Sequence, residues 1–199
     1  MPRSARNMRS GVCYHIIVRG NNRRWIFRES KEKEYFLELL RTYSREYHIA
    51  IYHYCVMDNH SHLLMKSCEK ADGISKMMQG VQMVYARSYK KENKLTGSLF
   101  EGRYKSYAVA KDEYLMECGR YIERNPIRAR IVKCPGSYRW SSFRYYGDGI
   151  ADELITMDPV YKQLSRDERE RRELYRKYIG VERAYESIVD GYFERVTSV

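Results

Sequence analysis

The chain has 199 residues, and its 37 lysines and arginines against 26 acidic residues give a net charge of +11 at pH 7. Hydrophobic residues make up 43% and charged residues 32%, which excludes a disordered or collagen-like chain and fits one domain with or without a tail. No segment approaches the roughly 18 apolar residues of a membrane span, and we expect no secretory signal. Five scattered cysteines without a C-x-x-C pair predict a reduced, cytoplasmic protein: Cys13, Cys55, Cys68, Cys118 and Cys134.

The excess positive charge favours a polyanionic partner, and nucleic acid is the commonest polyanion of the cytosol. The chain also has 20 tyrosines, and aromatic rings among basic residues are what unpaired bases stack on. Charge alone does not identify the partner, because many basic proteins bind no specific partner. The sequence motifs are therefore needed to predict the function.

The first half of the chain predicts a strand, a helix and two more strands. Residues 1–11 form a basic arm. The alternating segment 12–19 predicts a strand that ends in a turn at 20–22. Ser30 is placed to cap a helix over about 30–47, whose apolar residues recur at helical spacing. Strands follow at 49–57 and 60–66, joined by a turn at Asp58-Asn59.

The second half predicts a long helix capped by Asp72, an extended segment over 98–110, and a helix from Asp112 to about Arg124. The resulting β-α-β-β-α-β order predicts an α+β fold of the ferredoxin-like, split βαβ kind: an antiparallel sheet with two helices on one face, followed by a further helix. From about residue 148 the sequence becomes charged and helical, notably over 165–178. We therefore expect a domain over 1–147 and a helical C-terminal extension over 148–199.

The most pointed local pattern is His60-Ser61-His62. Side chains alternate along a strand, so the two imidazoles face the same way and can bind one metal ion. Asp58 could support them from the same face. Two surface histidines beside a turn are the plain alternative. The other histidines, His15, His48 and His53, have no such pairing and are expected to be ordinary, partly buried residues.

The segment 56–64, VMDNHSHLL, resembles the single-tyrosine HUH transposases, and among them the REP-associated tyrosine transposases. Three more segments agree with that family in order and spacing: 14–22, 97–106 and 121–129. Together the similarity extends over about residues 12–145. One departure is Ser61, where the family name denotes a bulky hydrophobic residue. That side chain faces away from the metal, so the departure concerns packing more than chemistry.

The resemblance implies a metal-dependent endonuclease and strand transferase that acts on single-stranded DNA through a 5′-phosphotyrosine. Matched by position, it implies His60 and His62 as metal ligands, Tyr121 as nucleophile and Asn125 as the residue completing the metal site. The chemistry agrees, because a tyrosine with a pKa near 10 needs help to attack at neutral pH, and a divalent cation can polarise the phosphate. Tyr121 and Asn125 are four residues apart and share a helix face.

Alternatives remain at two of these positions. Tyr114 lies seven residues before Tyr121 on the same helix face and is the second candidate nucleophile. Asn125 precedes Pro126 and could instead end one helix and cap the next. Two imidazoles and an amide suit Mn, Zn or Ni better than Mg. The resemblance implies Mg²⁺ or Mn²⁺, and of these two manganese fits the ligands better.

Single-stranded or hairpin DNA is the expected partner, for a monomer or a homodimer. An extended stretch near residue 105 alternates charge and ring, which suits backbone contact and base stacking. The residues expected to contact DNA are Arg3, Arg6, Arg9, Arg19, Arg23, Arg24, Arg103, Tyr104, Lys105, Tyr107, Arg128 and Arg130. The second candidate function is a catalytically silent DNA- or RNA-binding protein of the same fold. A zinc-stabilised structural domain is disfavoured by the absence of clustered cysteines.

Overall fold

The sheet has four antiparallel strands. The computed structural model describes residues 8–109 and 112–181. The strands are β1 (Cys13–Arg19), β2 (Ile49–Val56), β3 (His60–Ser67) and β4 (Lys105–Val109). Their spatial order is β2-β3-β1-β4, because the crossover through the first helix leaves a gap beside β1 that β3 fills. This order confirms the predicted α+β, ferredoxin-like arrangement.

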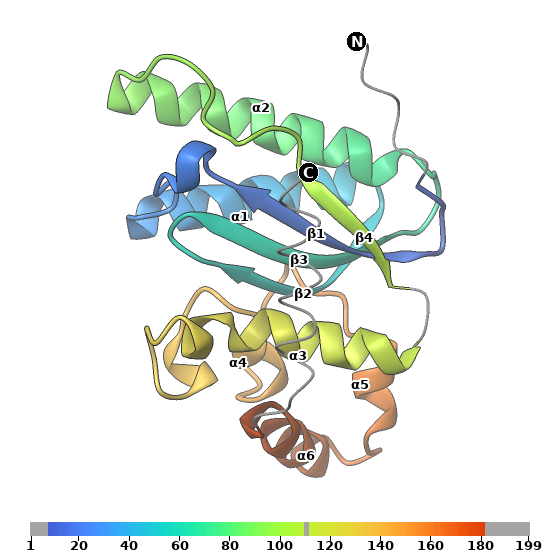
Figure 1. Cartoon of the computed structure of the whole chain (residues 1–199). Coiled ribbons are helices and arrows are strands. Elements are labelled where there is room, and N and C mark those ends of the chain that lie inside the picture. Colours follow the sequence, from blue (N-terminus) through green and yellow to red (C-terminus); the bar gives the residue numbers. More distant parts are fainter. Residues whose placement is uncertain (1–7, 110–111, 182–199) are drawn as a thin grey trace.

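The helices form layers on both faces of the sheet (Figure 1). The long helices α1 (Ser30–Glu46) and α2 (Gly73–Asn93) cover one face, and α3 (Asp112–Arg128) crosses the other. Beyond α3 lie the shorter helices α4 (Phe143–Tyr146), α5 (Pro159–Gln163) and α6 (Glu168–Gly180). Two 3-10 turns, η1 (Asn21–Arg23) and η2 (Pro135–Ser137), complete the described elements. None of the described helices combines the length and apolarity that crossing a membrane requires.

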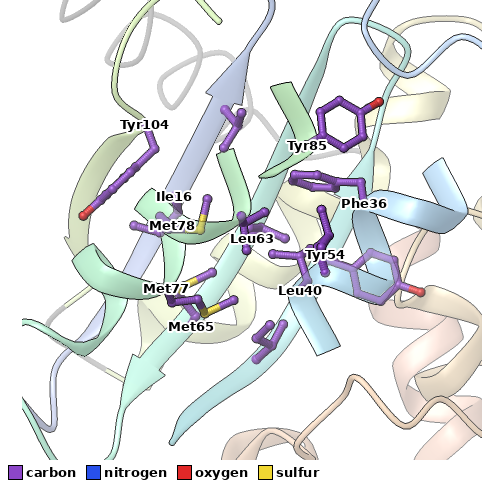
Figure 2. Packing of buried hydrophobic residues seen from close by; sticks show 14 of the residues in the cluster. Ile16, Phe36, Leu40, Tyr54, Leu63, Met65, Met77, Met78, Tyr85 and Tyr104 are labelled. Carbon is purple, nitrogen blue, oxygen red and sulfur yellow. The ribbon is translucent and has the colours of Figure 1, made fainter. Parts of the chain in front are cut away.

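The main core lies between the sheet and helices α1 and α2 (Figure 2). Alternate residues of the central strands point into it, as do the apolar stripes of both helices. Gly80 lets the helices approach closely, because a Cβ there would lie 2.3 Å from a ring carbon of Tyr43. Core residues labelled in Figure 2 include Ile16, Phe36, Leu40, Leu63, Met65, Met77, Met78 and Tyr85.

The strand residues that do not point into the main core lie on the opposite face of the sheet, which α3 covers. Register pairs His15 with Leu64, Ile17 with His62, and Arg19 with His60 across β1 and β3. Residues paired across strands project to the same side of a sheet. The histidine motif and the end of β1 therefore share the face over which α3 lies.

Several element boundaries differ from the sequence-based expectations. Glu29 rather than Ser30 is the N-cap of α1. Asp72 is at the N-cap of α2, but its carboxylate pairs with Lys76 at 2.7 Å. Within residues 98–109, the described part of the expected extended segment 98–110, only Lys105–Val109 is a strand. Helix α3, expected to end at about Arg124, continues to Arg128 and contains Pro126. The division at residues 147 and 148 stays a prediction.

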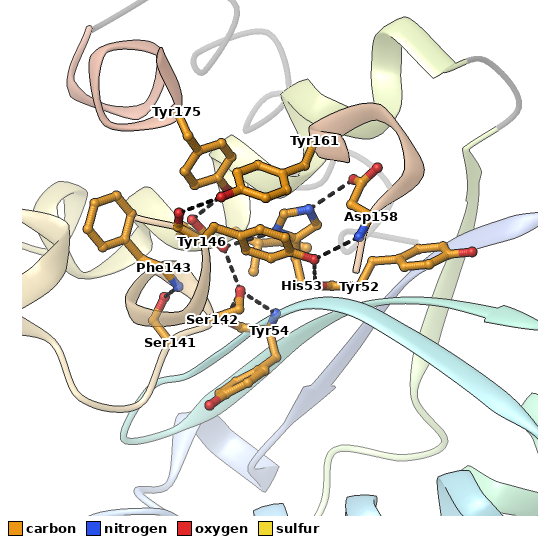
Figure 3. Close-up of polar contacts among 12 residues, drawn as sticks. Tyr52, His53, Tyr54, Ser141, Ser142, Phe143, Tyr146, Asp158, Tyr161 and Tyr175 are labelled. Atoms are coloured by element: carbon orange, nitrogen blue, oxygen red, sulfur yellow. Dashed lines mark hydrogen bonds and ion pairs between the residues drawn. The ribbon is translucent and has the colours of Figure 1, made fainter. Parts of the chain in front are cut away.

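The helices beyond α3 are joined to the sheet by a buried polar cluster around His53 of β2 (Figure 3). Its Nδ1 lies 2.9 Å from Glu123 of α3 and its Nε2 lies 3.0 Å from Asp158, the N-cap of α5. Both ring nitrogens face carboxylate oxygens, which can only accept, so the imidazole is protonated. Tyr175 of α6 donates to the second oxygen of Glu123 at 2.7 Å.

Candidate active site

The two histidines of the motif lie at the start of β3, on the face covered by α3. Their rings are edge to face with centroids 4.9 Å apart. His62 is buried and His60 is partly exposed. The strand parity expected from the sequence therefore brings both side chains to one place, at the end of β3 where β1 terminates.

A neighbouring side chain holds the Nδ1 atom of each imidazole. His60 Nδ1 lies 2.5 Å from the amide oxygen of Asn59, and since that oxygen only accepts, the nitrogen donates and Nε2 keeps its lone pair. His62 Nδ1 lies 2.9 Å from Nε2 of His15 on β1. Metal-binding histidines in proteins characteristically have the other ring nitrogen held in this way. The expected support from Asp58 is not found, because its carboxylate pairs with Lys33 at 2.7 Å.

All three imidazoles of this cluster are neutral at pH 7. Burial lowers the pKa of His60 to about 4, with Arg19 adding to the effect and Asp58 opposing it. Burial also lowers the pKa of His15 to about 3. For His62, burial lowers the pKa well below its usual value, and the neighbouring His60, His15, Arg19 and Arg128 add to the effect. Lone pairs for a cation are therefore available without the loss of a proton.

Helix α3 places Tyr121 against the histidines. The centroid of its ring lies 5.7 Å from that of His62 and 5.9 Å from that of His15, and its side chain is buried. Tyr114 is 45% exposed and begins about 10 Å earlier along the helix axis, at about 1.5 Å per residue. Of the two candidate nucleophiles, Tyr121 is the one in contact with the cluster.

Two influences on the Tyr121 phenol oppose each other. Burial raises the pKa of Tyr121, whereas the hydrogen bond and positive charge of Arg128 lower it, and the net shift is upward. The Arg128 guanidinium carbon lies 4.8 Å from the centre of the Tyr121 ring. An adjacent cation stabilises the phenolate form that attacks a phosphate.

Asn125 supports the backbone of α3. Its Nδ2 donates to the carbonyl of Tyr121 at 2.9 Å and to that of Ile122 at 3.2 Å. The Ile122 carbonyl would ordinarily accept from the backbone nitrogen of residue 126, but Pro126 has no N–H. The side-chain amide supplies the missing donor, and the helix continues to Arg128. A helix that ends at Asn125, the alternative left open by the sequence, is therefore wrong.

The donor set fits a divalent cation. Two neutral imidazoles with held Nδ1 atoms face one region, and the helix turn after Tyr121 brings Asn125 to the same side of α3. Within residues 8–109 and 112–181, no group of three or more His, Cys, Asp or Glu side chains forms a metal cluster. A cation here would take two nitrogens and complete its coordination with oxygens, a set that suits Mn²⁺ better than Mg²⁺.

Two basic side chains, Arg19 and Lys105, lie on the same face of the sheet as the cluster. Lys105 pairs with Ile17 in register, and Tyr107 pairs with His15, so both lie on the face that α3 covers. Burial lowers the pKa of Lys105, with Glu101 opposing and Arg19 adding to the effect. Five more of the expected DNA contacts are exposed: Arg9, Arg23, Arg24, Arg103 and Arg130. Arg3 and Arg6 lie outside the described residues.

Tyr104 does not have the expected place. Its side chain is buried at 4% exposure, and its hydroxyl lies 2.9 Å from that of Ser75 on α2. Successive side chains of an extended segment point to opposite faces, so Tyr104 enters the main core while Lys105 lies on the α3 side. The expectation that Tyr104 stacks on bases is wrong.

Three residues of the site region were missed or undervalued by sequence reasoning. His15 is 1% exposed and contacts His62, Asn59 holds His60, and His53 is fully buried between two carboxylates. His15 and His53 have no local pattern, because their partners come from other strands or helices. Asn59 adjoins its partner His60 in the sequence, but nothing in the pattern of residues there marks it as a hydrogen-bond partner. His48 is exposed in a left-handed turn with φ 53°.

A family model described as "Transposase IS200 like" matches residues 8–125. This match covers more than half of the chain and contains the histidine motif, Tyr121 and Asn125. The chain belongs to the IS200-like transposase family. Membership makes it a DNA-processing protein of the transposase type, and no protein of curated function matches it.

One solved structure shows the same fold as this IS200-like family member. A REP-associated tyrosine transposase bound to a REP hairpin aligns with a TM-score of 0.63 and 18% identity, over 79% of this chain and 93% of the other. A protein of Deinococcus radiodurans R1 assigned as a transposase aligns with a TM-score of 0.42 and 16% identity, over 65% of this chain and 92% of the other. At these identities the first similarity speaks for the fold, and the second adds no argument.

Proposed function

We propose that this chain is a metal-dependent single-stranded DNA endonuclease and strand transferase that acts at hairpin-flanking sites. The observation that carries the proposal is the contact of the Tyr121 ring with His62, next to Arg128. A candidate nucleophile, a pair of neutral imidazoles and the guanidinium of Arg128 thus meet in one place. The hairpin bound to the similarly folded transposase supports the form of the substrate.

In the proposed reaction the phenol oxygen of Tyr121 attacks the scissile phosphorus. The new tyrosine–phosphorus bond forms as the bond between phosphorus and the 3′ oxygen breaks, leaving a 5′-phosphotyrosine and a 3′-hydroxyl. The phenol proton leaves to water, and the departing 3′ oxygen takes up a proton. Attack by a 3′-hydroxyl on the phosphotyrosine reverses the sequence, so rejoining needs no nucleotide cofactor.

Different residues of the chain would activate the phenol, hold the cation and bind the DNA in this step. Arg128 holds the Tyr121 phenol and favours its ionised form. His60, His62 and the oxygen of Asn125 would hold Mg²⁺ or Mn²⁺, which supplies Lewis-acid polarisation of the phosphate. Arg19 and Lys105, at the rim of the cluster, attract the phosphates of the strand that enters it.

The decisive experiment is detection of the covalent intermediate. The chain is incubated with Mn²⁺ and a labelled hairpin oligonucleotide with unpaired flanks, and denaturing gels show any protein–DNA adduct. The parent chain and Tyr114→Phe should form the adduct, whereas Tyr121→Phe should form none and still bind the DNA. His60→Ala, His62→Ala and a chelator should each remove metal-dependent adduct formation. The residual adduct in the double variant should be little below that in either single variant, because residues acting as a unit are non-additive.

Each unfavourable outcome has a definite meaning. An adduct in Tyr121→Phe refutes the assigned nucleophile, and an adduct in the presence of chelator refutes the metal dependence. DNA binding by the parent chain with no adduct under any metal would establish the second candidate function, a catalytically silent nucleic-acid-binding protein.

A further inference from the structure

Trp25 is a large aromatic side chain at the surface of the loop between β1 and α1. It is 55% exposed, whereas its neighbours Ile26 and Phe27 are fully buried. The backbone N–H groups of Ile26 and Phe27 both donate to the carbonyl of Asp58, at 2.9 and 2.8 Å. The Trp25 carbonyl accepts from the hydroxyl of Tyr89 at 3.1 Å. The loop is therefore fixed to the body of the protein, and the indole projects from a rigid base.

Arginines adjoin this indole in the sequence, and one of them lies over its ring. Arg23, Arg24 and Arg28 are exposed, and the guanidinium carbon of Arg28 lies 5.4 Å from the centre of the Trp25 ring. The nearby Glu29 is paired with Lys31 at 3.3 Å, which offsets its charge. An exposed tryptophan among arginines presents a flat ring and a positive field together. Those are the two elements that bind unpaired nucleic acid.

The turn before Trp25, which carries Arg23 and Arg24, has a backbone conformation that residues with side chains rarely adopt. Asn22 and Arg23 have φ values of 50° and 57°. Gly20 is packed so closely that a Cβ there would lie 2.2 Å from the carbonyl oxygen of Arg24. Left-handed backbone at non-glycine residues costs on the order of 1 kcal/mol or more and concentrates at functional sites. The surrounding contacts maintain it here.

The same loop is connected directly to the candidate active site through Asn59. The Asn59 side chain donates to the carbonyl of Arg23 at 3.4 Å, and its oxygen lies 2.5 Å from Nδ1 of His60. The Gly20 N–H donates to the carbonyl of Asn59 at 2.8 Å. Trp25 therefore projects from the end of the sheet where the histidine pair begins, a place that DNA leading to the cluster can reach.

We propose that Trp25 is a stacking platform for an unpaired base of the DNA substrate, with Arg23 and Arg24 binding the phosphates beside that base. The platform recognises a nucleobase by its π-face and needs no particular sequence. The proposal rests on the proposed function only for the identity of the ligand, single-stranded DNA. It requires binding and no chemistry, so each can be tested without the other.

The indole itself reports on the proposal, because the chain has two tryptophans. In a Tyr121→Phe, Trp140→Phe chain, Trp25 is the sole indole, and a hairpin oligonucleotide with unpaired thymidine flanks should quench its fluorescence. In a Tyr121→Phe, Trp25→Phe chain, the remaining Trp140 should not respond. Trp25→Ala should weaken binding of that oligonucleotide by about tenfold or more, as expected for one stacked base, with the salt dependence unchanged. Trp25→Phe should retain most of the affinity.

The outcomes separate this proposal from the proposed function. Binding without quenching, or equal affinity in Trp25→Ala, overturns the platform, and an adduct formed by the parent chain would still stand. Quenching by DNA without any adduct from the parent chain overturns the endonuclease and leaves the platform intact. A Trp25 signal that changes with protein concentration in the absence of DNA assigns the indole to self-association and also overturns the proposal. Thermal unfolding should show Trp25→Ala folded with little loss, because the side chain is exposed.

Discussion

The buried imidazoles of His15 and His62 lie 2.9 Å apart, ring nitrogen to ring nitrogen, although 47 residues separate them in the chain. Strands β1 and β3 bring them together, and their rings are stacked at a centroid distance of 5.1 Å. His15 therefore fixes the rotation of the His62 ring and determines which of its nitrogens faces the proposed cation.

Removing this contact should weaken metal binding. His15→Phe keeps a ring of similar size and loses the hydrogen bond, and we expect Mn²⁺ affinity to fall by about 10- to 100-fold, as for other groups that orient a metal ligand. Titration calorimetry with Mn²⁺ measures this without any catalytic step. His15→Gln, which can restore the hydrogen bond, should recover part of the loss, and the exposed His48→Asn is the matched control. Unchanged affinity in His15→Phe would mean that His62 is positioned by other contacts.

Arg128 should set the pH dependence of adduct formation. Because its hydrogen bond and charge lower the pKa of Tyr121 against the larger effect of burial, Arg128→Gln should raise that pKa further. Fewer phenolates are then present at any pH below it, so single-turnover adduct formation should slow by up to about tenfold per unit of added shift. The loss should shrink as the pH rises. Arg130→Gln, at an exposed position just beyond the helix, should leave the profile in place, and an equal loss at every pH would assign Arg128 to DNA binding alone.

The His53 cluster should make the unfolding free energy fall as the pH rises into the alkaline range. Burial opposes its charged form, but the hydrogen bonds and charges of Asp158 and Glu123 outweigh burial and raise the pKa of His53 from 6.5 to about 9. A pKa raised in the folded state contributes stability that is fully present below about 6.5 and is lost as the pH rises through about 9. The unfolding free energy should therefore fall by about 3 kcal/mol across this window.

Urea unfolding at pH 6 and pH 10 measures this change. His53→Gln should be less stable at pH 6, because it leaves two buried carboxylates without their cation, and it should lack most of the decline towards pH 10. An equal decline in the variant and the parent would trace the pH dependence to other groups.

The basic segment at the start of β4 should govern the salt dependence of DNA binding. Replacing Arg103 and Lys105 with alanine should flatten the log–log slope of affinity against salt by roughly one to two, at about 0.7 per phosphate contact on single strands. The double replacement Arg169→Ala, Lys177→Ala removes the same charge from α6 and should leave the slope unchanged. If the α6 replacement flattened the slope and the Arg103, Lys105 replacement did not, the DNA would bind on the other side of α3.

The fold could be predicted from the sequence because strands and helices leave local, periodic patterns of apolar residues. Alternation marked β1 and β3, helical spacing marked α1 and α2, and a strand period of two placed His60 and His62 together. The same parity argument, applied to Tyr104 and Lys105, separates them onto opposite faces of the sheet. The expectation that Arg103, Tyr104, Lys105 and Tyr107 form one DNA-binding surface overlooks this, because neighbouring residues of a strand face opposite sides.

Tertiary partners account for most of what sequence reasoning missed. His15 and His53 have no informative neighbours in the chain, and their roles come from strand register and from helices that follow much later. Gly119 shows the same limit. A Cβ there would lie 2.7 Å from the His53 ring, a requirement visible only once α3 is placed on β2.

The amide of Asn125 limits which substitutions this position can tolerate. Its N–H group replaces the donor that Pro126 lacks, and the turn that it preserves carries Arg128 back over the Tyr121 ring. An aspartate would keep oxygens for a cation but lose the donor, and an alanine would lose both. With the proposed role of its oxygen at the cation, one side chain would meet two requirements, and residues 125 and 126 should change together or not at all as related sequences diverge.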